Sequence, residues 1–505
     1  MIKVLCNEQV RIVDRSTIER KNIRPLDLME QAASACTTWL LNRIPEGSDF
    51  LVVAGQGNNG GDGMAIARML WQRGKSVDVV VVDGTGTPSD GFRANTERWN
   101  KLIGKDVRVV KSAKELPART NETVIIDALF GSGLNRPASD TAADVIKALN
   151  EGEGRIISID IPSGLFADRP TPEKSSVIRS TTTLCLQIPR MAFFLPEYQE
   201  FVGNWELIDI GLDTEAIEEA PAEAFILSHR DIAALQPPRP LHGHKGTFGH
   251  ALLLAGSRGK AGAAVLAAGA CLRSGAGLVT VRTPGSCVIP VQVNCPEAMC
   301  DPEPEDEFLD EVVKTEPYDA IGIGPGLGTS RQTGNVVKRV IQDHPGPLVI
   351  DADALNILSD NPTWLAFLPA GTILTPHPGE FARLAGKISD SFDRIKAQQD
   401  LAKKHNVFIL LKGRFSTIAC PDGQLYINPT GNHGMAKGGS GDALTGLITG
   451  LLASGLSPMR AVLTGAYVHG LAGDLCAKEN HPVGMTSGDL VSYIPSAFRA
   501  IEESL

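Results

Sequence analysis

The sequence predicts an α/β protein of two domains, each organised around a largely parallel sheet. The 505 residues exceed what one hydrophobic core normally holds, so two domains are expected. Near the start, a strand, a glycine-rich turn, a helix and a second strand follow one another, which is typical of a doubly wound sheet. A similar alternation begins after residue 250. An acidic stretch and the proline-rich segment 236–240 separate the two, and we place the domains at 1–221 and 222–505.

The composition favours a soluble globular protein that acts on small molecules. A formal net charge of −10 argues against a nucleic acid or an anionic membrane as partner. The sequence has no apolar run of about 18 residues that would span a membrane. The N-terminus lacks the apolar core of a signal peptide, and the nine cysteines are scattered without a Cys-x-x-Cys pair. We therefore expect reduced thiols and a cytoplasmic location.

The first domain begins with a helix from Pro25 to about residue 41 and continues with a buried strand at residues 50–54. The turn that follows, GQGNNGGDG at residues 55–63, matches the dinucleotide fingerprint, and Asp83 lies where a ribose-binding acid would be expected. Its Asp62 would place a carboxylate beside a pyrophosphate, however. So many polar groups suit a hydrogen-bonded small ligand or a hard cation better. In the alternative interpretation, the glycines only ease packing between the strand and the helix.

Two further strand ends carry acids followed by glycine, at residues 124–131 and 156–164. The carboxyl ends of parallel strands form the binding crevice of a doubly wound sheet. We therefore expect Asn59, Asp127 and Ser163 to share one cation, and Asp160 to be free for proton transfer. The alternative is that each acid only caps the next helix. Strands at 181–186 and 206–210 are expected to complete this sheet.

In the second domain, strands are expected at residues 251–255, 278–281, 320–323, 348–350, 372–374, 407–411 and 416–420. A loop at 256–262 and a helix at 263–273 follow the first of them. Lys412 directly follows a buried strand, where an unpaired cation is costly. Its partner is either a bound phosphate or a carboxylate such as Asp351. The histidines of residues 242–250 alternate with glycines, which favours a loop in contact with a ligand or a neighbouring segment over a metal site.

The strongest single signal is NPTGNHGMAKGGSGDALTG, at residues 428–446. Three glycines and Asp442 stand immediately before an apolar helix. Glycine amides and a helix N-terminus together form an anion site. We expect these amides to hold a phosphate and Asp442 to face a reacting hydroxyl, the alternative being that Asp442 merely caps the helix. The sequence contains no Walker motif.

These motifs, taken in order, closely resemble those of the bifunctional NAD(P)H-hydrate repair enzymes. The resemblance covers nearly the whole chain and rests on seven marks: GQGNNGGDG, Asp127 with GSGLNRP, DIPSG, GHKGTFGH, GPGLG, TPHPGE, and the segment 428–446. It implies a Rossmann-like epimerase domain followed by a ribokinase-like, ADP-dependent dehydratase domain. Because none of these motifs is broken, both activities are expected to be intact.

For the first domain, the resemblance implies interconversion of the R and S epimers of NADHX or NADPHX, the hydrated forms of the reduced cofactors. Asn59, Asp127 and Ser163 are the implied K⁺ ligands, and Asp160 is the implied acid–base residue. The implied contacts to the hydrated nicotinamide are Asn58, Asn59, Gly60, Gly61, Asp62, Gly131, Ser132, Gly133, Leu134, Asn135, Arg136, Pro137 and Asp160.

For the second domain, the resemblance implies removal of water from the S epimer with ADP, giving AMP and phosphate, with Mg²⁺ at the nucleotide. Asp442 is the implied base, and Gly439, Ser440 and Gly441 would supply amides for the phosphoryl charge. The implied hydrate-binding residues are Ala263, Gly326, His377 and Asp442, and the implied ADP-binding residues are Lys412, Gly413, Arg414, Phe415, Ser416 and Gly441.

Three other functions are compatible with parts of this pattern. The chain could join a Rossmann-type dehydrogenase to a sugar or vitamin kinase, or it could be a kinase alone in its second half. It could also be a nucleotide sensor without catalysis. We further expect a homo-oligomer whose partners are small molecules.

Overall fold

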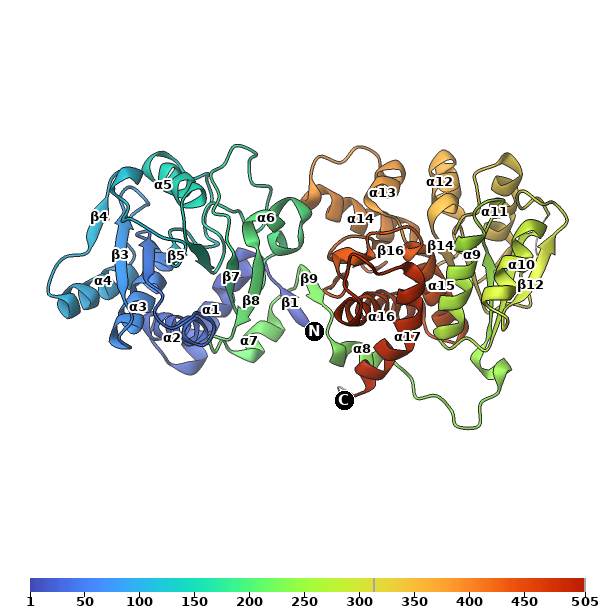
Figure 1. Ribbon diagram of the computed structural model, residues 1–505, viewed down its shortest axis with the longest axis horizontal. Helices are drawn as coiled ribbons and strands as arrows, with labels where there is room; N and C mark the ends of the chain where they lie inside the picture. Colours follow the sequence, from blue (N-terminus) through green and yellow to red (C-terminus); the bar gives the residue numbers. More distant parts are fainter. Residues whose placement is uncertain (312–313, 504–505) are drawn as a thin grey trace. The chain divides into compact units, whose positions relative to one another are not determined.

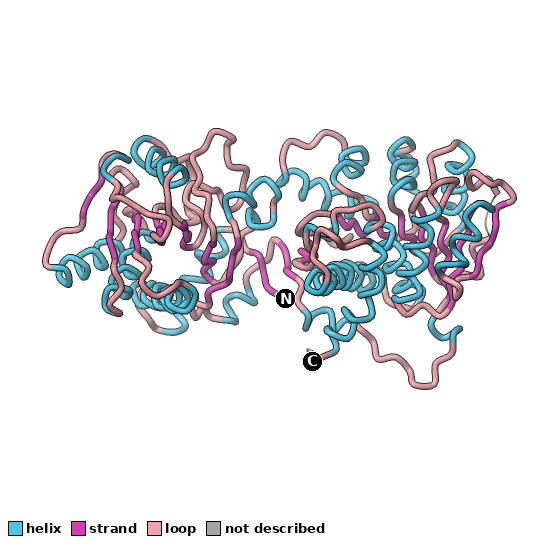
Figure 2. Tube along the Cα trace, viewed as in Figure 1, coloured by secondary structure: helices cyan, strands magenta, loops and turns pink. Residues whose placement is uncertain are grey.

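The computed structural model describes residues 1–311 and 314–503 (Figure 1). The chain forms two compact units. The first unit comprises Lys3–Glu223, and the second comprises Met1–Ile2 together with Ala224–Leu505. Both units are α/β, with parallel strands at the centre and helices around them (Figure 2). Among the described residues, none of the helices has the length and apolar character needed to cross a membrane.

The sheet of the first unit has seven parallel strands in the order β4-β3-β2-β5-β6-β7-β8. The strands are β2 (Phe50–Ala54), β3 (Val77–Val82), β4 (Arg108–Val110), β5 (Val124–Ala128), β6 (Arg155–Ile159), β7 (Thr182–Leu186) and β8 (Asn204–Ile208). From β2 the chain proceeds to one edge, and it then returns to the other side of β2 with β5. This reversal makes the gap between β2 and β5 the switch point of a doubly wound sheet.

Helices cover both faces of this sheet, because alternate residues of each strand point in opposite directions. In β2, Phe50, Val52 and Ala54 pack into the cluster that contains α2 and α3. Leu51 and Val53 pack against α5 on the other face. The helices are α1 (Asn7–Lys21), α2 (Pro25–Arg43), α3 (Asn58–Gln72), α4 (Asp90–Ile103), α5 (Asp140–Glu151), α6 (Gln199–Val202) and α7 (Thr214–Glu219), with short 3₁₀ turns at Ala113–Glu115, Met191–Phe194 and Pro196–Tyr198.

Two details of the first unit differ from the sequence analysis. Helix α1 precedes the helix expected at Pro25 and was not expected. Helix α3 begins at Asn58, so Asn58, Asn59 and Asp62 stand in its first turns and not in a preceding loop. The helix can start this early because Gly60 has no side chain: a Cβ there would lie 1.8 Å from the carbonyl oxygen of Gly55.

The second unit contains a sheet in the order β1-β9-β18-β17-β16-β15-β14-β13-β10-β11-β12. Strands β10 to β16 pair in parallel, and β17 is antiparallel to both of its neighbours. The strands are β1 (Ile2–Val4), β9 (Ala224–Ile226), β10 (His250–Leu254), β11 (Leu278–Pro284), β12 (Met299–Glu303), β13 (Ala320–Ile323), β14 (Leu348–Ile350), β15 (Ile373–Leu374), β16 (Phe408–Leu411), β17 (Ser416–Ala419) and β18 (Leu425–Asn428). Here the chain reverses between β10 and β13, which is the second switch point.

Helix α15 (Ser440–Ala453) is the central helix of the second unit and packs closely on α9 (Ala261–Arg273). A Cβ on Gly446 would lie 1.9 Å from the carbonyl oxygen of Ala267, so only glycine permits this approach. The remaining helices are α8 (His229–Leu235), α10 (Gly285–Asn294), α11 (Arg331–Asp343), α12 (Ala352–Asp360), α13 (Pro378–Ala385), α14 (Ser391–His405), α16 (Pro458–Glu479) and α17 (Ser487–Glu502), with 3₁₀ turns at Lys245–Phe248, Pro362–Phe367 and His433–Met435.

Candidate functional sites in the two units

A pocket of about 490 Å³ opens at the switch point of the first unit. Its walls come from α1, the turn between β2 and α3, the loop after β5, and the end of β6. The expected residues that line it are Asn58, Asn59, Asp62, Gly131, Ser132, Gly133, Leu134, Asn135, Arg136, Pro137 and Asp160. Gly60 and Gly61 do not line it. They pack instead against Gly55 and Met29, so their place in the structure is to let the helix approach its neighbours.

Asp160 is held rigidly at the wall of this pocket. Its backbone has φ +68°, a left-handed conformation that costs a non-glycine residue about 1–3 kcal/mol. Its Oδ2 accepts a hydrogen bond of 2.8 Å from the Ser132 amide, and its Oδ1 lies 3.3 Å from Nη2 of Arg190. The carboxyl group is therefore fixed in position, next to a buried cation.

The pocket residues that the sequence analysis did not identify include Asn7, Arg11, Asp14 and Arg190. The first three lie on one face of α1 at helical spacing, while Val10, Val13 and Thr17 form its buried face. That amphipathic spacing is the signal that would have revealed them. Burial, together with the charge of Asp160, raises the pKa of Asp14 to about 6, although Arg190 opposes the shift. Burial and the charges of Asp160 and Asp14 raise the pKa of Asp62 well above its usual range.

Asp127 and Ser163, two of the three expected cation ligands, are in direct contact. Ser163 Oγ donates to Asp127 Oδ1 at 2.6 Å, its amide donates to Oδ2 at 2.9 Å, and Ser158 Oγ donates to Oδ2 at 2.7 Å. Burial raises the pKa of Asp127, and these donors oppose the shift.

Asn59, the third expected ligand, is buried, and neither atom of its amide group has a hydrogen-bond partner among the described residues. A buried amide without a partner indicates that a ligand is missing. Amide, carboxylate and hydroxyl oxygens are the donors that a hard cation takes, so the residues present fit K⁺. Within residues 1–311 and 314–503, no group of three or more His, Cys, Asp or Glu side chains could hold a metal ion.

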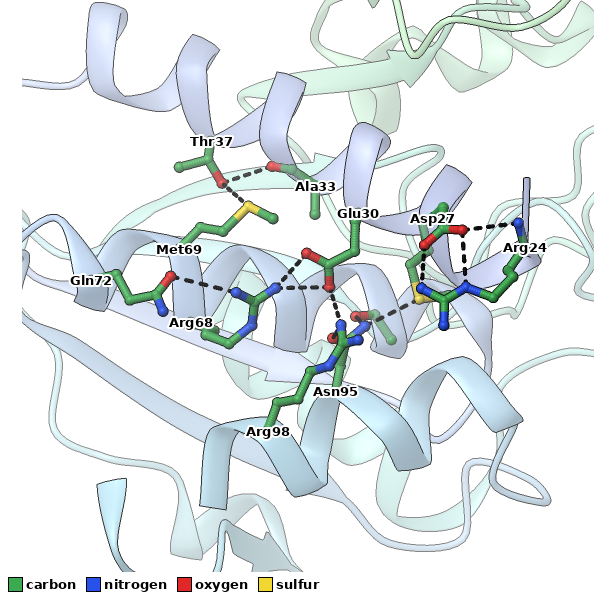
Figure 3. A network of polar contacts seen from close by, with 12 residues as sticks. Arg24, Asp27, Glu30, Ala33, Thr37, Arg68, Met69, Gln72, Asn95 and Arg98 are labelled. Atoms are coloured by element: carbon green, nitrogen blue, oxygen red, sulfur yellow. Dashed lines mark hydrogen bonds and ion pairs between the residues drawn. The ribbon is translucent and has the colours of Figure 1, made fainter. Parts of the chain in front are cut away.

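A network of charged and polar side chains links α3 to α2 and α4 (Figure 3). Glu30 on α2 accepts from Arg68 at 2.5 Å and from Arg98 at 2.6 Å. Asn95, fully buried on α4, donates to the carbonyl oxygen of Gly61 at 3.3 Å. These contacts fix α2, α3 and α4 relative to one another and thereby position the pocket residues at the start of α3.

In the second unit, the glycine-rich segment ends at the N-terminus of α15. Gly439 has φ +94°, which requires glycine, and it stands at the cap position with no side chain to cap the helix. Asp442 is the third residue of the helix, and its carboxyl group accepts no hydrogen bond among the described residues. The capping alternative for Asp442 is therefore wrong. Burial and the nearby Asp351 raise the pKa of Asp442 to about 6, against the effect of Lys412.

Lys412 pairs with Asp351 at 2.6 Å, so the carboxylate alternative for its partner is the one found in the structure. Asp351 also accepts a hydrogen bond from Thr445 Oγ1 at 2.7 Å. A Cβ on Gly441 would lie 3.0 Å from Nζ of Lys412, which places the lysine directly beside the start of α15. Lys412, Gly441 and Asp442 therefore come together as expected.

The other expected residues of the second unit fall into separate places. Ala263 and Gly326 are neighbours at the switch point, since a Cβ on Gly326 would lie 2.9 Å from the Cβ of Ala263. Gly413 and Ser416 hydrogen-bond one another, and the Arg414 guanidinium lies 4.6 Å from the centre of the Phe415 ring. His377 instead caps α13, with its Nδ1 accepting from the amide of Gly379 at 3.0 Å.

His469 is a further residue that the sequence analysis missed. It is buried on α16, and its Nε2 lies 2.9 Å from the carbonyl oxygen of Ser440, in the first turn of α15. Burial lowers its pKa to about 4, so the ring is neutral at physiological pH and can donate to this carbonyl. The signal would have been a lone histidine inside an apolar helix.

The comparisons with known proteins agree with this two-part organisation. Residues 25–192 match the family described as YjeF-related protein N-terminus, and residues 251–496 match NAD(P)H-hydrate dehydratase. The bifunctional NAD(P)H-hydrate repair enzyme of Moorella thermoacetica is 35% identical, over 90% of this chain and 88% of its own. That of Thermofilum pendens is 34% identical, over 99% and 97%.

Among solved structures, the ADP/ATP-dependent NAD(P)H-hydrate dehydratase of Bacillus subtilis, co-crystallised with ATP and Mg²⁺, is 33% identical with a TM-score of 0.48. It covers 55% of this chain and 99% of its own. Because whole-length relatives exceed 30% identity, the chain belongs to the family of bifunctional NAD(P)H-hydrate repair enzymes.

Proposed function

We propose that this protein repairs NADH and NADPH that have become hydrated at the nicotinamide ring. The first unit interconverts the R and S epimers of the hydrate, and the second removes water from the S epimer with ADP as phosphate donor. The observation that carries the proposal is the position of Asp442. Its carboxyl group does not cap the helix, has a raised pKa, and stands at a glycine-rich helix start beside Lys412.

In the second unit, Asp442 accepts the proton of the substrate hydroxyl as its oxygen attacks the β-phosphorus of ADP and AMP leaves. The amides of Gly439, Ser440 and Gly441 point out of the start of α15 and stabilise the charge on the transferred phosphoryl group. The phosphate ester formed is a better leaving group than hydroxide. Loss of phosphate and a ring proton then restores the double bond of NAD(P)H.

Mg²⁺ usually binds phosphate oxygens and keeps several of its waters, so a nucleotide-bound Mg²⁺ needs few protein ligands. The nearby carboxylates suit this arrangement, because Asp351 already pairs with Lys412 and Asp353 with Lys260. Bound there, Mg²⁺ would neutralise part of the charge of the phosphates. Lys412 adds a fixed positive charge at the same helix start.

In the first unit, the hydrated nicotinamide occupies the 490 Å³ pocket, where Asp160 exchanges protons with it. Asn59, which lines this pocket, would hold K⁺ together with the buried Asp127 and Ser163. The unpartnered amide of Asn59 supports this assignment, since K⁺ would supply the interaction that its oxygen lacks.

The test is to incubate the purified protein with both epimers of hydrated NADH, ADP, Mg²⁺ and K⁺, and to follow the nicotinamide absorbance. Full recovery of NADH is expected, with AMP and phosphate formed in equal amounts. Recovery that stops at the S fraction would contradict the epimerase assignment. A stable phosphorylated product, or no recovery with ADP or ATP, would instead favour a small-molecule kinase.

Two variants assign the steps to the units. Asp442→Asn should stop recovery while epimer exchange and ADP binding continue. Asp160→Asn should slow exchange but leave dehydration of the S epimer unchanged. Equal loss of both activities in either variant would contradict the two-site assignment.

A further inference from the structure

Epimerisation in the first unit needs more than one proton-transferring group, and this inference rests on that proposed activity. Water that adds to a carbon–carbon double bond next to a ring nitrogen places its hydroxyl on the carbon bonded to that nitrogen. To invert this carbon, the hydroxyl must leave and water must return on the opposite face. One group must give a proton to the departing oxygen, and another must take a proton from the entering water.

Asp160 is one carboxyl group in the pocket, and α1 brings a second. Asp14 lines the same pocket, together with Asn7 and Arg11 of its helix. Its carboxyl group makes no hydrogen bond and no ion pair with any described residue. Asp160, in contrast, is held by the Ser132 amide and Arg190. A partly buried carboxyl group without a partner costs stability, which indicates that it is present for function.

We propose that Asp14 is the second acid–base residue of the epimerase pocket and that it works as a pair with Asp160. When Asp14 carries the proton, it gives that proton to the substrate hydroxyl as the carbon–oxygen bond breaks. The electron pair of that bond goes to the oxygen, which leaves as water. The lone pair of the ring nitrogen forms a carbon–nitrogen double bond, and water adds to the other face. The Asp160 carboxylate takes the proton of the entering water, and the reverse reaction exchanges the two roles.

The charged surroundings suit such a pair. The ionisable side chains that line the pocket are Arg11, Asp14, Asp62, Arg136, Asp160 and Arg190. Arg190 lies 3.3 Å from Asp160 and forms an ion pair with it, while burial and the charge of Asp160 favour the protonated form of Asp14 against the effect of Arg190. Two neighbouring carboxyl groups in unlike environments are a common way of providing one acid and one base.

Asp62 is the other acid in the pocket, and its environment suits a different task. It is 9% exposed, and burial with two neighbouring carboxylates raises its pKa well above the usual range. These effects favour its protonated form, which can donate a hydrogen bond to the substrate. Asp14, whose pKa is raised to about 6, can both give a proton and recover it.

The test measures exchange between the R and S epimers in the full-length protein, without ADP, for the wild type and for Asp14→Asn. Asp14→Asn should lower kcat for exchange by about 100-fold or more. Glu19→Gln, which changes an exposed acid on the same helix, should leave exchange unchanged. Dehydration of the S epimer should proceed at the wild-type rate in both variants. Exchange at the wild-type rate in Asp14→Asn would overturn the proposal, whereas no exchange by the wild type would overturn the epimerase function itself.

The pH profile and the stability separate catalysis from a structural role. In the wild type, kcat/KM for exchange should decline as pH rises through about 6, where Asp14 loses its proton. Asp14→Asn should lack this limb and unfold at no lower temperature than the wild type, because it removes an unpaired carboxyl group. If Asp14→Asn folds poorly, Asp14→Glu is measured in its place. Partial activity with the decline in kcat/KM shifted to another pH supports the role of Asp14, and an unchanged pH profile overturns it.

Discussion

Nζ of Lys412 lies 2.6 Å from Oδ1 of Asp351, and the Asp351 side chain is only 1% exposed. This ion pair lies behind Gly441, at the start of α15, where we place the phosphates of ADP. Asp351 receives a second hydrogen bond from Thr445 of the same helix. The lysine therefore links β16, the buried end of β14 and the N-terminus of α15, so its charge contributes to the stability of the fold as well as to anion binding.

Lys412→Met should destabilise the second unit and weaken nucleotide binding together. Removing one partner of a buried ion pair typically costs about 3–5 kcal/mol, because the other charge is left without compensation. The exposed pair of Lys260 with Asp353 provides the control, and Lys260→Met should cost less than about 1 kcal/mol. Thermal unfolding measures the loss of stability, and isothermal titration with ADP measures affinity. Equal stability of the two variants would contradict the importance of the pair.

The dehydratase rate should fall as the solution is acidified through about pH 6. Asp442 acts as a base and must be ionised, and its pKa is raised to about 6 by burial and by Asp351. A group whose pKa is raised loses its charge at higher pH than usual, so activity declines below about pH 6 and not near pH 4. The measurement is kcat/KM for the S epimer from pH 4.5 to 8. Asp442→Asn should lower kcat by about 10²–10⁴-fold and remove this dependence.

Two glycines of the same turn should respond in opposite ways to alanine. A Cβ on Gly60 would lie 1.8 Å from the carbonyl oxygen of Gly55, whereas a Cβ on Gly57 would meet nothing within 4 Å. Gly60→Ala should cost about 3 kcal/mol and abolish exchange, because the start of α3 must move. Gly57→Ala should cost less than about 1 kcal/mol and retain activity. Urea unfolding monitored by tryptophan fluorescence measures the stability of the first unit. Trp39, Trp71, Trp99 and Trp205 all lie in this unit.

Glu30→Gln should destabilise the first unit more than the loss of an exposed acid does. Glu30 forms ion pairs with both Arg68 and Arg98, and the Arg68 side chain is only 14% exposed (Figure 3). Hydrogen bonds to charged groups contribute about 1.5–3 kcal/mol, so a loss of that size is expected. Asp90→Asn, which breaks an exposed pair with Arg93, should cost less than about 0.5 kcal/mol. If both variants unfold at the same urea concentration, the network does not support α3.

Most of the fold could be predicted from the sequence, because many of its central strands are short, largely apolar runs that are followed by glycine, proline or acid. Residues 50–54, 77–82 and 320–323 form strands with the expected bounds. The doubly wound order then follows from chain connectivity. Asp160 could be placed near the first pocket, because an acid at the carboxyl end of a central strand points into the crevice.

The rest depended on tertiary packing that no local pattern contains. Arg190 follows β7 in an irregular segment, and only the folded chain brings it to Asp160. The amphipathic spacing of α1 indicates a helix with a polar face, but that this face forms a pocket wall follows only from the way the helix packs. The partner of Lys412 was one of two alternatives until the structure placed Asp351 beside it, 61 residues away along the chain.

K⁺ should stabilise the first unit through Asn59. The Asn59 amide is buried without a partner among the described residues, and Asp127 and Ser163 stand ready as further oxygen donors. A cation that binds only the folded state adds about 1–3 kcal/mol when its concentration exceeds its Kd about 5- to 100-fold. Urea unfolding in KCl should therefore have a higher midpoint than in choline chloride of equal ionic strength. Asn59→Ala should abolish this difference, while Asn58→Ala, which removes the exposed neighbouring amide, should retain it. Equal midpoints for the wild type in both salts would show that these three residues do not hold K⁺.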